Sequence, residues 1–269
     1  MSKNEYINGM LEYEMSRLYS NILCFSTTRH GGHSKGNYAT FNCNPFVNDI
    51  EFDCKLNTIH LQTVYGLQHS DILFAKQTHS TNVLCIDDDF IGAGHCVRKQ
   101  KLNGVDALIT DHKNVCITVS TADCVPIALY DTKNTAVGVV HAGWRGTNGR
   151  ILLATLQEMN KRYGTQGENI VAAIGPSISV KAFEVGNEVY DAFRESGFDM
   201  ESIAQKNADT GKWHIDLWQA NKQQLIDFGV DNTNIEVAGI CTYTQYKDFF
   251  SARRLGINSG RMTTGIMIK

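Results

Sequence analysis

The sequence of 269 residues lacks the features that divide a chain into domains or send it to a membrane. It has only three prolines, and no Pro/Gly/Ser-rich linker, block of like charges or internal repeat marks a domain boundary. No apolar run approaches the roughly 20 residues that span a bilayer, and Met1–Met15 lacks the apolar core of a signal peptide. We therefore expect a cytoplasmic protein without a membrane partner. We expect it to form a single domain over residues 1–269, with an N-terminal extension at 1–20 and a surface loop or insertion at 199–212.

Clusters of basic residues and closely spaced cysteines are also missing. The formal net charge is -3 and no basic cluster occurs early in the chain, which argues against a nucleic-acid partner. Eight cysteines are scattered along the chain without a Cys-x-x-Cys pair, so a zinc ribbon or a thioredoxin-type redox pair has no support. We expect reduced thiols and a small-molecule partner.

What the sequence does contain is a mixture of strand-like and helical segments. β-branched and apolar runs predict strands at residues 72–75, 83–86, 115–120, 125–130 and 135–140. Amphipathic segments predict helices at residues 53–67, 148–163, 186–196 and 216–228. We predict an α+β fold in which mixed β-sheets pack as a sandwich with flanking helices. The strand order and the oligomeric state stay open.

Three residues with metal-binding side chains stand where an apolar, strand-like run ends or breaks: His79, Cys124 and His141. Each of them alone is more often structural than functional. Two imidazoles and a thiolate, however, form a known ligand set for catalytic zinc, in which the fourth position stays open. Together they predict a metal site at one sheet rim, with no pair of ligand atoms farther apart than about 4 Å.

The stretch "VVHAGWRGT" at residues 139–147 predicts an anion site. A strand that ends in a glycine-containing loop and feeds a helix presents free amides and the positive end of a dipole. Arg145 adds a cationic fork suited to phosphate or carboxylate, beside the amides of Gly146 and Thr147. The alternative is a plain strand-to-helix connection with a solvated arginine.

The chain resembles the laccase-domain family, once labelled multicopper polyphenol oxidase, in segments that follow the family's order. These are "FSTTRHGG", "AKQTHS", "GVDALIT", "STADCVPI", "VVHAGWRGT", "AAIGPSI", "FEVG" and "CTYTQYKDFFSARRLGINSGRM". The resemblance implies a single-domain zinc enzyme with His79, Cys124 and His141 as metal ligands. It also implies phosphorolysis of adenosine, inosine, guanosine or methylthioadenosine, and hydrolytic deamination of adenosine, in one pocket. The chain departs from the family at "TFNCNPFVND", where Phe46 stands in place of the usual histidine.

The older oxidase label does not suit this composition. A laccase with four coppers needs about ten imidazoles and several His-x-His pairs. This chain has nine histidines and no such pair. Zinc is therefore the expected cofactor, and copper is not expected as the native metal.

Further residues are assigned roles around the metal. Asp123, next to Cys124, is a candidate for orienting a histidine ligand or for moving a proton, and completes a predicted catalytic set with the three ligands. Candidate contacts to phosphate or ribose are Arg145, Gly146, Thr147, Arg29 and Asn42, with Arg253, Arg254 and Arg261 as further anion candidates. The expected partners are nucleosides and phosphate.

Two other functions stay open at this point. Cys124 could act as a nucleophile with His79 or His141 as its base, which would give a Cys–His hydrolase or amidase. Some bacterial members of the family are described as peptidoglycan editing factors, so cell-wall precursors would be the substrates. Alternatively, zinc could only stabilise the fold of a non-catalytic binding module.

Overall fold

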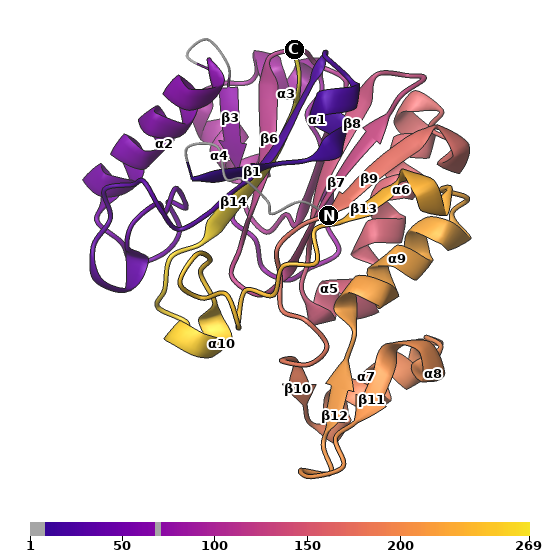
Figure 1. Ribbon diagram of the computed structural model, residues 1–269. Helices are drawn as coiled ribbons and strands as arrows, with labels where there is room; N and C mark the ends of the chain where they lie inside the picture. The colour runs from indigo at the N-terminus through magenta and orange to yellow at the C-terminus, as the bar shows by residue number, and fades with distance from the viewer. Residues whose placement is uncertain (1–8, 68–70) are drawn as a thin grey trace.

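Two mixed β-sheets packed face to face form the centre of the structure (Figure 1). The computed structural model describes residues 9–67 and 71–269. The first sheet has the order β1-β2-β14-β6-β3, with bounds Met10–Glu12, Ile22–Thr27, Met262–Ile268, Val115–Thr121 and Asp71–Phe74. The second has the order β13-β9-β7-β8-β5-β4, with bounds Ile235–Val237, Ile170–Ile174, Val125–Asp131, Ala136–Ala142, Ala107–Thr110 and Val83–Cys85. Parallel pairs join β3 to β6, β4 to β5 and β13 to β9, and the other pairs are antiparallel.

Alternation along the strands produces three apolar layers. In β8, Val137 and Val139 point into the core between the two sheets, whereas Val140 belongs to the core on the opposite face. That second core lies beneath α6 (Ile151–Tyr163) and α9 (Leu217–Asp227). The outer face of the first sheet packs against α2 (Glu51–Tyr65). The predicted α+β sandwich with flanking helices is confirmed.

The long helices lie close to their predicted positions. The helices predicted at residues 53–67, 148–163, 186–196 and 216–228 correspond to α2, α6, α7 (Asn187–Glu195) and α9. The shorter helices are α1 (Glu14–Leu18), α3 (Asp88–Gly92), α4 (His95–Lys101), α5 (Trp144–Asn148), α8 (Met200–Ile203) and α10 (Ala252–Leu255). Among the described residues, none of the helices combines the length and apolarity that crossing a membrane requires.

Secondary structure is present in both segments that were predicted to be peripheral, the N-terminal extension at 1–20 and the surface loop or insertion at 199–212. Residues 1–8 of the predicted N-terminal extension lie outside the described part, but β1 pairs with β2, and Tyr13 and Met15 are buried. Residues 199–212 are not a plain loop, because they contain α8 and β11 (Ala204–Lys206). With β10 (Glu184–Val185) and β12 (Trp213–Ile215), β11 forms a small sheet that projects from the bottom of the view in Figure 1.

Candidate metal centre

His79, Cys124 and His141 meet where the chain passes from one large sheet to the other. His79 lies in the loop from β3 to β4, and Cys124 lies in the turn from β6 to β7; both connections run from the first sheet to the second. His141 is the penultimate residue of β8. The sequence places His79 at the end of a strand and the site at one sheet rim. The structure corrects both points, because His79 follows β3 by several loop residues and the rim belongs to two sheets.

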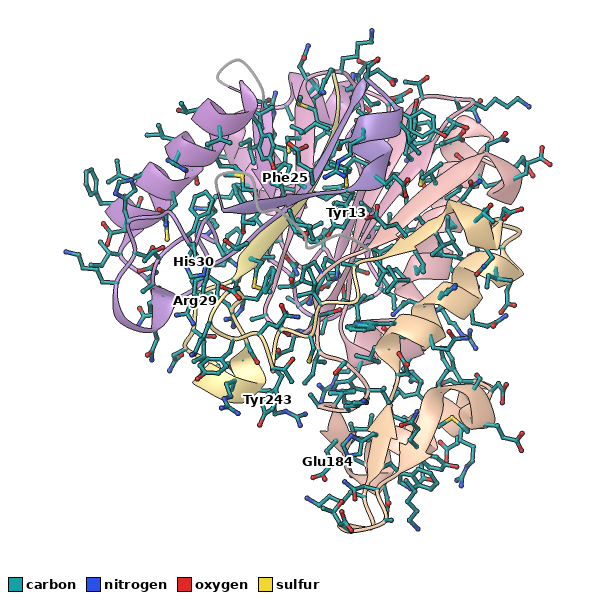
Figure 2. All side chains as sticks on the ribbon, in the orientation of Figure 1. Tyr13, Phe25, Arg29, His30, Glu184 and Tyr243 are labelled. Carbon is teal, nitrogen blue, oxygen red and sulfur yellow. The ribbon has the colours of Figure 1, made fainter. Side chains whose placement is uncertain are left out.

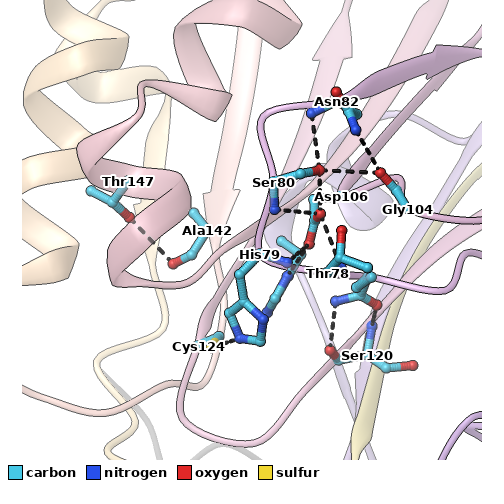
Figure 3. A network of polar contacts seen from close by, with 12 residues as sticks. Thr78, His79, Ser80, Asn82, Gly104, Asp106, Ser120, Cys124, Ala142 and Thr147 are labelled. Atoms are coloured by element: carbon cyan, nitrogen blue, oxygen red, sulfur yellow. Dashed lines mark hydrogen bonds and ion pairs between the residues drawn. The ribbon is translucent and has the colours of Figure 1, made fainter.

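The three side chains converge on one point; Figure 3 labels two of them, His79 and Cys124, which face each other. Cys124 Sγ lies 3.7 Å from His79 Nε2, and the two imidazole rings are 4.8 Å apart between centroids at an interplanar angle of 70°. All three ligand atoms lie within 4.8 Å of one another, a bound somewhat wider than the expected limit of about 4 Å. Within residues 9–67 and 71–269, no other group of three or more His, Cys, Asp or Glu side chains is arranged to share an ion.

The buried carboxylate of Asp106 holds two of these residues in place (Figure 3). It accepts hydrogen bonds from the backbone amides of Thr78, His79 and Ser80 at 3.2, 2.9 and 2.7 Å. It also accepts from Ser80 Oγ at 2.6 Å and pairs with His141 Nδ1 at 2.7 Å. Because Nδ1 is engaged, Nε2 is the ring nitrogen of His141 left to ligate a metal.

Sequence reasoning did not single out Asp106, although "GVDALIT" contains it. The available signal was an acidic residue immediately before β5, a mostly apolar strand that is buried throughout. Burial alone would raise the pKa of this carboxyl, but the bonds from His141 and Ser80 hold it well below its usual range. His79 has φ 59°, a conformation that costs a residue with a side chain about 1–3 kcal/mol. The amides donated to Asp106 hold the loop in that conformation.

The thiol and the imidazole perturb each other. Burial raises the pKa of Cys124, but the neighbouring His141 and His79 outweigh it and lower the pKa to about 6. Burial lowers the pKa of His141, whereas Cys124 and Asp106 raise it to about 9. A thiolate is therefore stable here at neutral pH, and a thiolate is the form that binds metal.

The residues present fit a zinc ion. The donor set of two imidazoles and one thiolate suits zinc, and a carboxylate behind one histidine is a usual supporting group. Gly143 leaves the adjoining space open, since a Cβ at this position would lie 2.9 Å from both Cys124 Sγ and His79 Cδ2. A larger residue would press on two of the three ligands.

Asp123 does not make the contact predicted for it. Its carboxylate accepts hydrogen bonds from Thr242 Oγ1 at 2.6 Å and from the backbone amide of Arg253 at 2.7 Å. The carboxylate that orients a histidine ligand is instead Asp106. Asp123 thus ties the C-terminal segment to the turn that carries Cys124.

The segment after His141 divides into an exposed part and a buried part. Arg145 is exposed on α5, with its guanidinium carbon 4.2 Å from the centre of the Trp144 ring. Thr147 is buried; its amide donates to Gly143 O, and its hydroxyl is bonded to Ala142 O and to the Asn221 amide. The expected anion contact at Thr147 is therefore wrong, because its polar groups already have partners. Gly146 is buried as well, so Arg145 is the group of this segment that faces solvent.

Arg29 and Asn42 serve the surrounding loops. Arg29 (Figure 2) donates to Ala39 O at 2.9 Å and to Tyr246 O at 2.8 Å, and its guanidinium lies over the ring of Phe250. Asn42 is fully buried and bonds to Asp49 Oδ2 and to the Arg261 amide. The predicted contact of Asn42 with ribose is therefore wrong, and Arg29 joins two chain segments.

The C-terminal arginines are held by neighbouring groups. Arg253 donates to the backbone oxygen of Glu184 at 3.0 Å, and Arg254 lies over the rings of Tyr243 and Tyr246; Figure 2 labels Glu184 and Tyr243. Arg261 donates to the carbonyl oxygens of Ser259, Gly260 and Ile257 within its own loop. These contacts position the loops. Arg261 also interacts electrostatically with Cys124 and Asp123, so it stays an anion candidate beside Arg145.

The sequence of the chain is similar to a known protein family and to named relatives. Residues 23–269 match the family described as multi-copper polyphenol oxidoreductase laccase. The chain is 50% identical over 259 residues to a purine nucleoside phosphorylase of Bacteroides thetaiotaomicron, covering 96% of each. It is 41% identical to adenosine deaminase RL5 of an unknown prokaryotic organism, over 97% of this chain and 100% of that protein.

A solved structure supports the same assignment. The structure of YlmD from Geobacillus stearothermophilus superposes with a TM-score of 0.89 at 30% identity, covering 98% of both chains. The match therefore extends over the sheets and connections that carry His79, Cys124 and His141. The chain belongs to the multi-copper polyphenol oxidoreductase laccase family.

Proposed function

We propose that the protein is a zinc-dependent purine nucleoside phosphorylase that also deaminates adenosine. The observation that carries the proposal is the convergence of His79, Cys124 and His141, backed by the buried carboxylate of Asp106. Relatives over nearly the whole chain are named purine nucleoside phosphorylase and adenosine deaminase. The proposal covers one catalytic domain over residues 1–269, whereas the cytoplasmic location stays a prediction from the sequence.

The two reactions differ in the nucleophile. In phosphorolysis, a phosphate oxygen bonds to the anomeric carbon of adenosine, the glycosidic bond breaks, and adenine leaves with the bonding electron pair and takes up a proton. In deamination, water bonds to C6 of the purine, ammonia leaves, and inosine forms. Inosine, guanosine and methylthioadenosine are further proposed substrates of the first reaction.

The residues around the metal site have a proposed part in both reactions, and Arg145 has one in phosphorolysis alone. A zinc ion held by His79, Cys124 and His141 would supply Lewis-acid polarisation and activation of water. Asp106 fixes the tautomer of His141 and the position of the loop that carries His79. Arg145 holds the phosphate as a charged, bidentate donor. Asp123, bonded to Thr242 and Arg253, fixes the turn of Cys124 and is not assigned a proton transfer.

The test of this function is product analysis with and without phosphate. We expect purified protein incubated with adenosine to give inosine in both cases, and adenine only when phosphate is present. Chromatographic separation of adenine, inosine and hypoxanthine distinguishes the two reactions. A chelator is expected to stop both and added zinc to restore both, and a lack of turnover of any nucleoside would refute the proposal.

Arg145→Ala is expected to separate the two activities. Phosphate is a substrate of phosphorolysis alone, so loss of a charge-assisted contact worth about 1.5–3 kcal/mol should fall on that reaction. We expect phosphorolysis to decrease by roughly 10- to 150-fold while deamination changes less than about twofold. Both rates are measured on adenosine, and phosphorolysis is followed at phosphate concentrations well below its KM, where a loss of phosphate binding lowers the rate.

Arg194→Ala serves as the matched control for this variant. Arg194 is also a surface arginine, paired with Asp191 on α7, and its loss should change neither rate. Equal decreases of both reactions in Arg145→Ala, with zinc content and fold intact, would place the phosphate elsewhere.

A second function has one specific observation in its favour. Cys124, His141 and Asp106 form a chain of contacts typical of a Cys–His–Asp nucleophile system, in which the thiolate attacks a carbonyl carbon. A hydrolase of this kind, acting on cell-wall precursors, would not need metal. Against it, His79 places a second imidazole on the thiolate, which favours metal binding over nucleophilic attack. Full activity after chelation would establish the thiol mechanism instead.

A further inference from the structure

A large groove lies apart from the metal centre, between α2 and α4 and beside β3. It encloses about 1350 Å³ and is lined mainly by apolar atoms, including the side chains of Ile72, Leu73 and Phe74. β3 is an edge strand of the first sheet. None of the residues assigned to the metal site lines this groove.

Exposed apolar side chains gather around the groove. Among the described residues, five of the eight large apolar side chains that are exposed either line it or adjoin residues that line it: Phe46 (42%), Ile50 (59%), Phe52 (66%), Ile59 (56%) and Val97 (47%). Exposed apolar side chains scattered singly are normal, but a contiguous group of them marks an interaction surface.

The two walls of the groove carry opposite charge. One wall is the start of α2, where the sequence "DIEFDCK" at residues 49–55 has three acidic residues and one lysine, of which Asp49, Glu51 and Lys55 line the groove. The other wall is α4, "HCVRKQK", which has Arg98, Lys99 and Lys101 and no acidic residue; Arg98 and Lys99 line the groove. Two of these charges have partners within the chain, since Glu51 pairs with Lys55 and Arg98 with Asp71. The Glu51–Lys55 pair is exposed and therefore weak, so its charges can exchange partners. Arg98 is only partly exposed and also donates to Ala93 O and Ile91 O, so Lys99 is the freer charge of this wall.

We propose that this groove is the interface of a symmetric dimer of the chain. A two-fold axis brings each surface against its own copy, so an isologous interface requires a self-complementary patch. The groove meets that requirement because the axis sets the acidic wall of each protomer against the basic wall of the other. A partner of one charge would match one wall and be repelled by the other, so a second copy fits better than an acidic or a basic protein. The apolar side chains at its centre supply the burial that stabilises the contact.

Sedimentation equilibrium over a range of concentrations tests the proposal on the full chain. We expect the average mass to rise from 29.9 kDa toward twice that value. Phe52→Glu should raise the dissociation constant at least about tenfold, because it places a charge among the exposed apolar side chains beside the groove. Leu18→Glu is the matched control, since Leu18 on α1 is also 66% exposed and lies outside the groove. It should dimerise like the parent chain.

Charge reversal makes the test specific to the two walls. Glu51→Lys cancels the net negative charge of the α2 wall, and Lys99→Glu with Lys101→Glu makes the α4 wall acidic like the α2 wall, so each variant alone should dimerise at least about tenfold more weakly. When the two variants are mixed, the basic α4 wall of the first faces the acidic α2 wall of the second, so heterodimers should form more tightly than either homodimer. All three positions are exposed, so the variants should fold. A parent chain that stays at 29.9 kDa, association only with another protein, or a mixture that does not recover dimerisation would overturn the proposal.

Discussion

Replacing Cys124 with alanine is expected to remove the bound zinc and to bring both phosphorolysis and deamination below detection. Each proposed reaction draws on the same ion, so the two activities should disappear together. This pattern differs from that of Arg145→Ala, which should affect mainly the phosphate-dependent reaction. Zinc content is measured by mass spectrometry of the purified variant, and turnover is measured on adenosine with and without phosphate.

The reason for so large an effect is the small number of protein ligands. A catalytic zinc site has three protein ligands, so loss of one leaves two imidazoles, which hold zinc weakly. The lost ligand is also the anionic one, because His141 and His79 lower the pKa of the Cys124 thiol to about 6. Without it, the binding site carries no negative charge of its own and depends on Asp106 behind His141.

Cys85→Ala is the matched control for this experiment. Cys85 is also a partly buried free thiol, and it bonds to Tyr163 OH at the end of β4, away from the metal site. Its replacement should leave zinc content and both activities in place. Retention of zinc and turnover in Cys124→Ala would exclude Cys124 as a ligand, whereas retention of zinc with loss of turnover would favour the nucleophile mechanism.

Two of the three candidate metal ligands are marked by a local pattern in the sequence. Cys124 separates two strand-forming runs and His141 lies near the end of another, and a buried polar residue at such a point needs a partner or a ligand. The long helices were predictable for a similar reason, since a helical period is visible within a single segment. The sheet order was not, because β14 lies between β2 and β6 through pairings that join distant parts of the chain.

The supporting groups of the site depend on contacts that sequence spacing does not reveal. Asp123 adjoins Cys124 and so seemed the natural carboxylate to orient a histidine, but its partners come from the C-terminal segment. Thr147 looked free to bind an anion until α9 placed Asn221 against its hydroxyl. In both cases a residue from a distant element satisfies the polar group, and only the tertiary structure identifies that residue.

Asp106→Asn is expected to weaken both the fold and the metal site, although it changes a single atom of the side chain. Five donors converge on the two carboxylate oxygens, and an amide offers one oxygen and one NH₂ group in their place. Whichever way the amide turns, donors face donors in a fully buried position. Breaking a buried charged pair in this way costs about 3–5 kcal/mol, which denaturant unfolding of the metal-free protein would measure.

The stability lost in Asp106→Asn depends on pH, because the pKa of Asp106 is depressed in the folded protein. A carboxyl whose folded-state pKa lies below its unfolded value contributes stability above that unfolded value, near 3.9, and loses it as the pH falls further. The difference in unfolding free energy between the parent chain and Asp106→Asn should therefore be full at neutral pH. It should narrow below about pH 4, because this carboxyl takes up protons in the unfolded chain at a higher pH than in the folded protein.

Zinc affinity shows whether Asp106 positions a metal ligand or only stabilises the fold. Asparagine can donate its NH₂ to His141 Nδ1, which places the proton on Nε2 and blocks the nitrogen that faces Cys124. We therefore expect zinc affinity to fall by about 10- to 100-fold, measured by competition with a chelating dye on folded protein. Asp131→Asn is the matched control, because Asp131 is equally buried and accepts from the amides of Lys133 and Asn134 in the turn after β7. That variant should lose stability and keep its zinc affinity, since no metal ligand contacts it. If Asp106→Asn behaved in the same way, the carboxylate would stabilise the loop of His79 without setting the tautomer of His141.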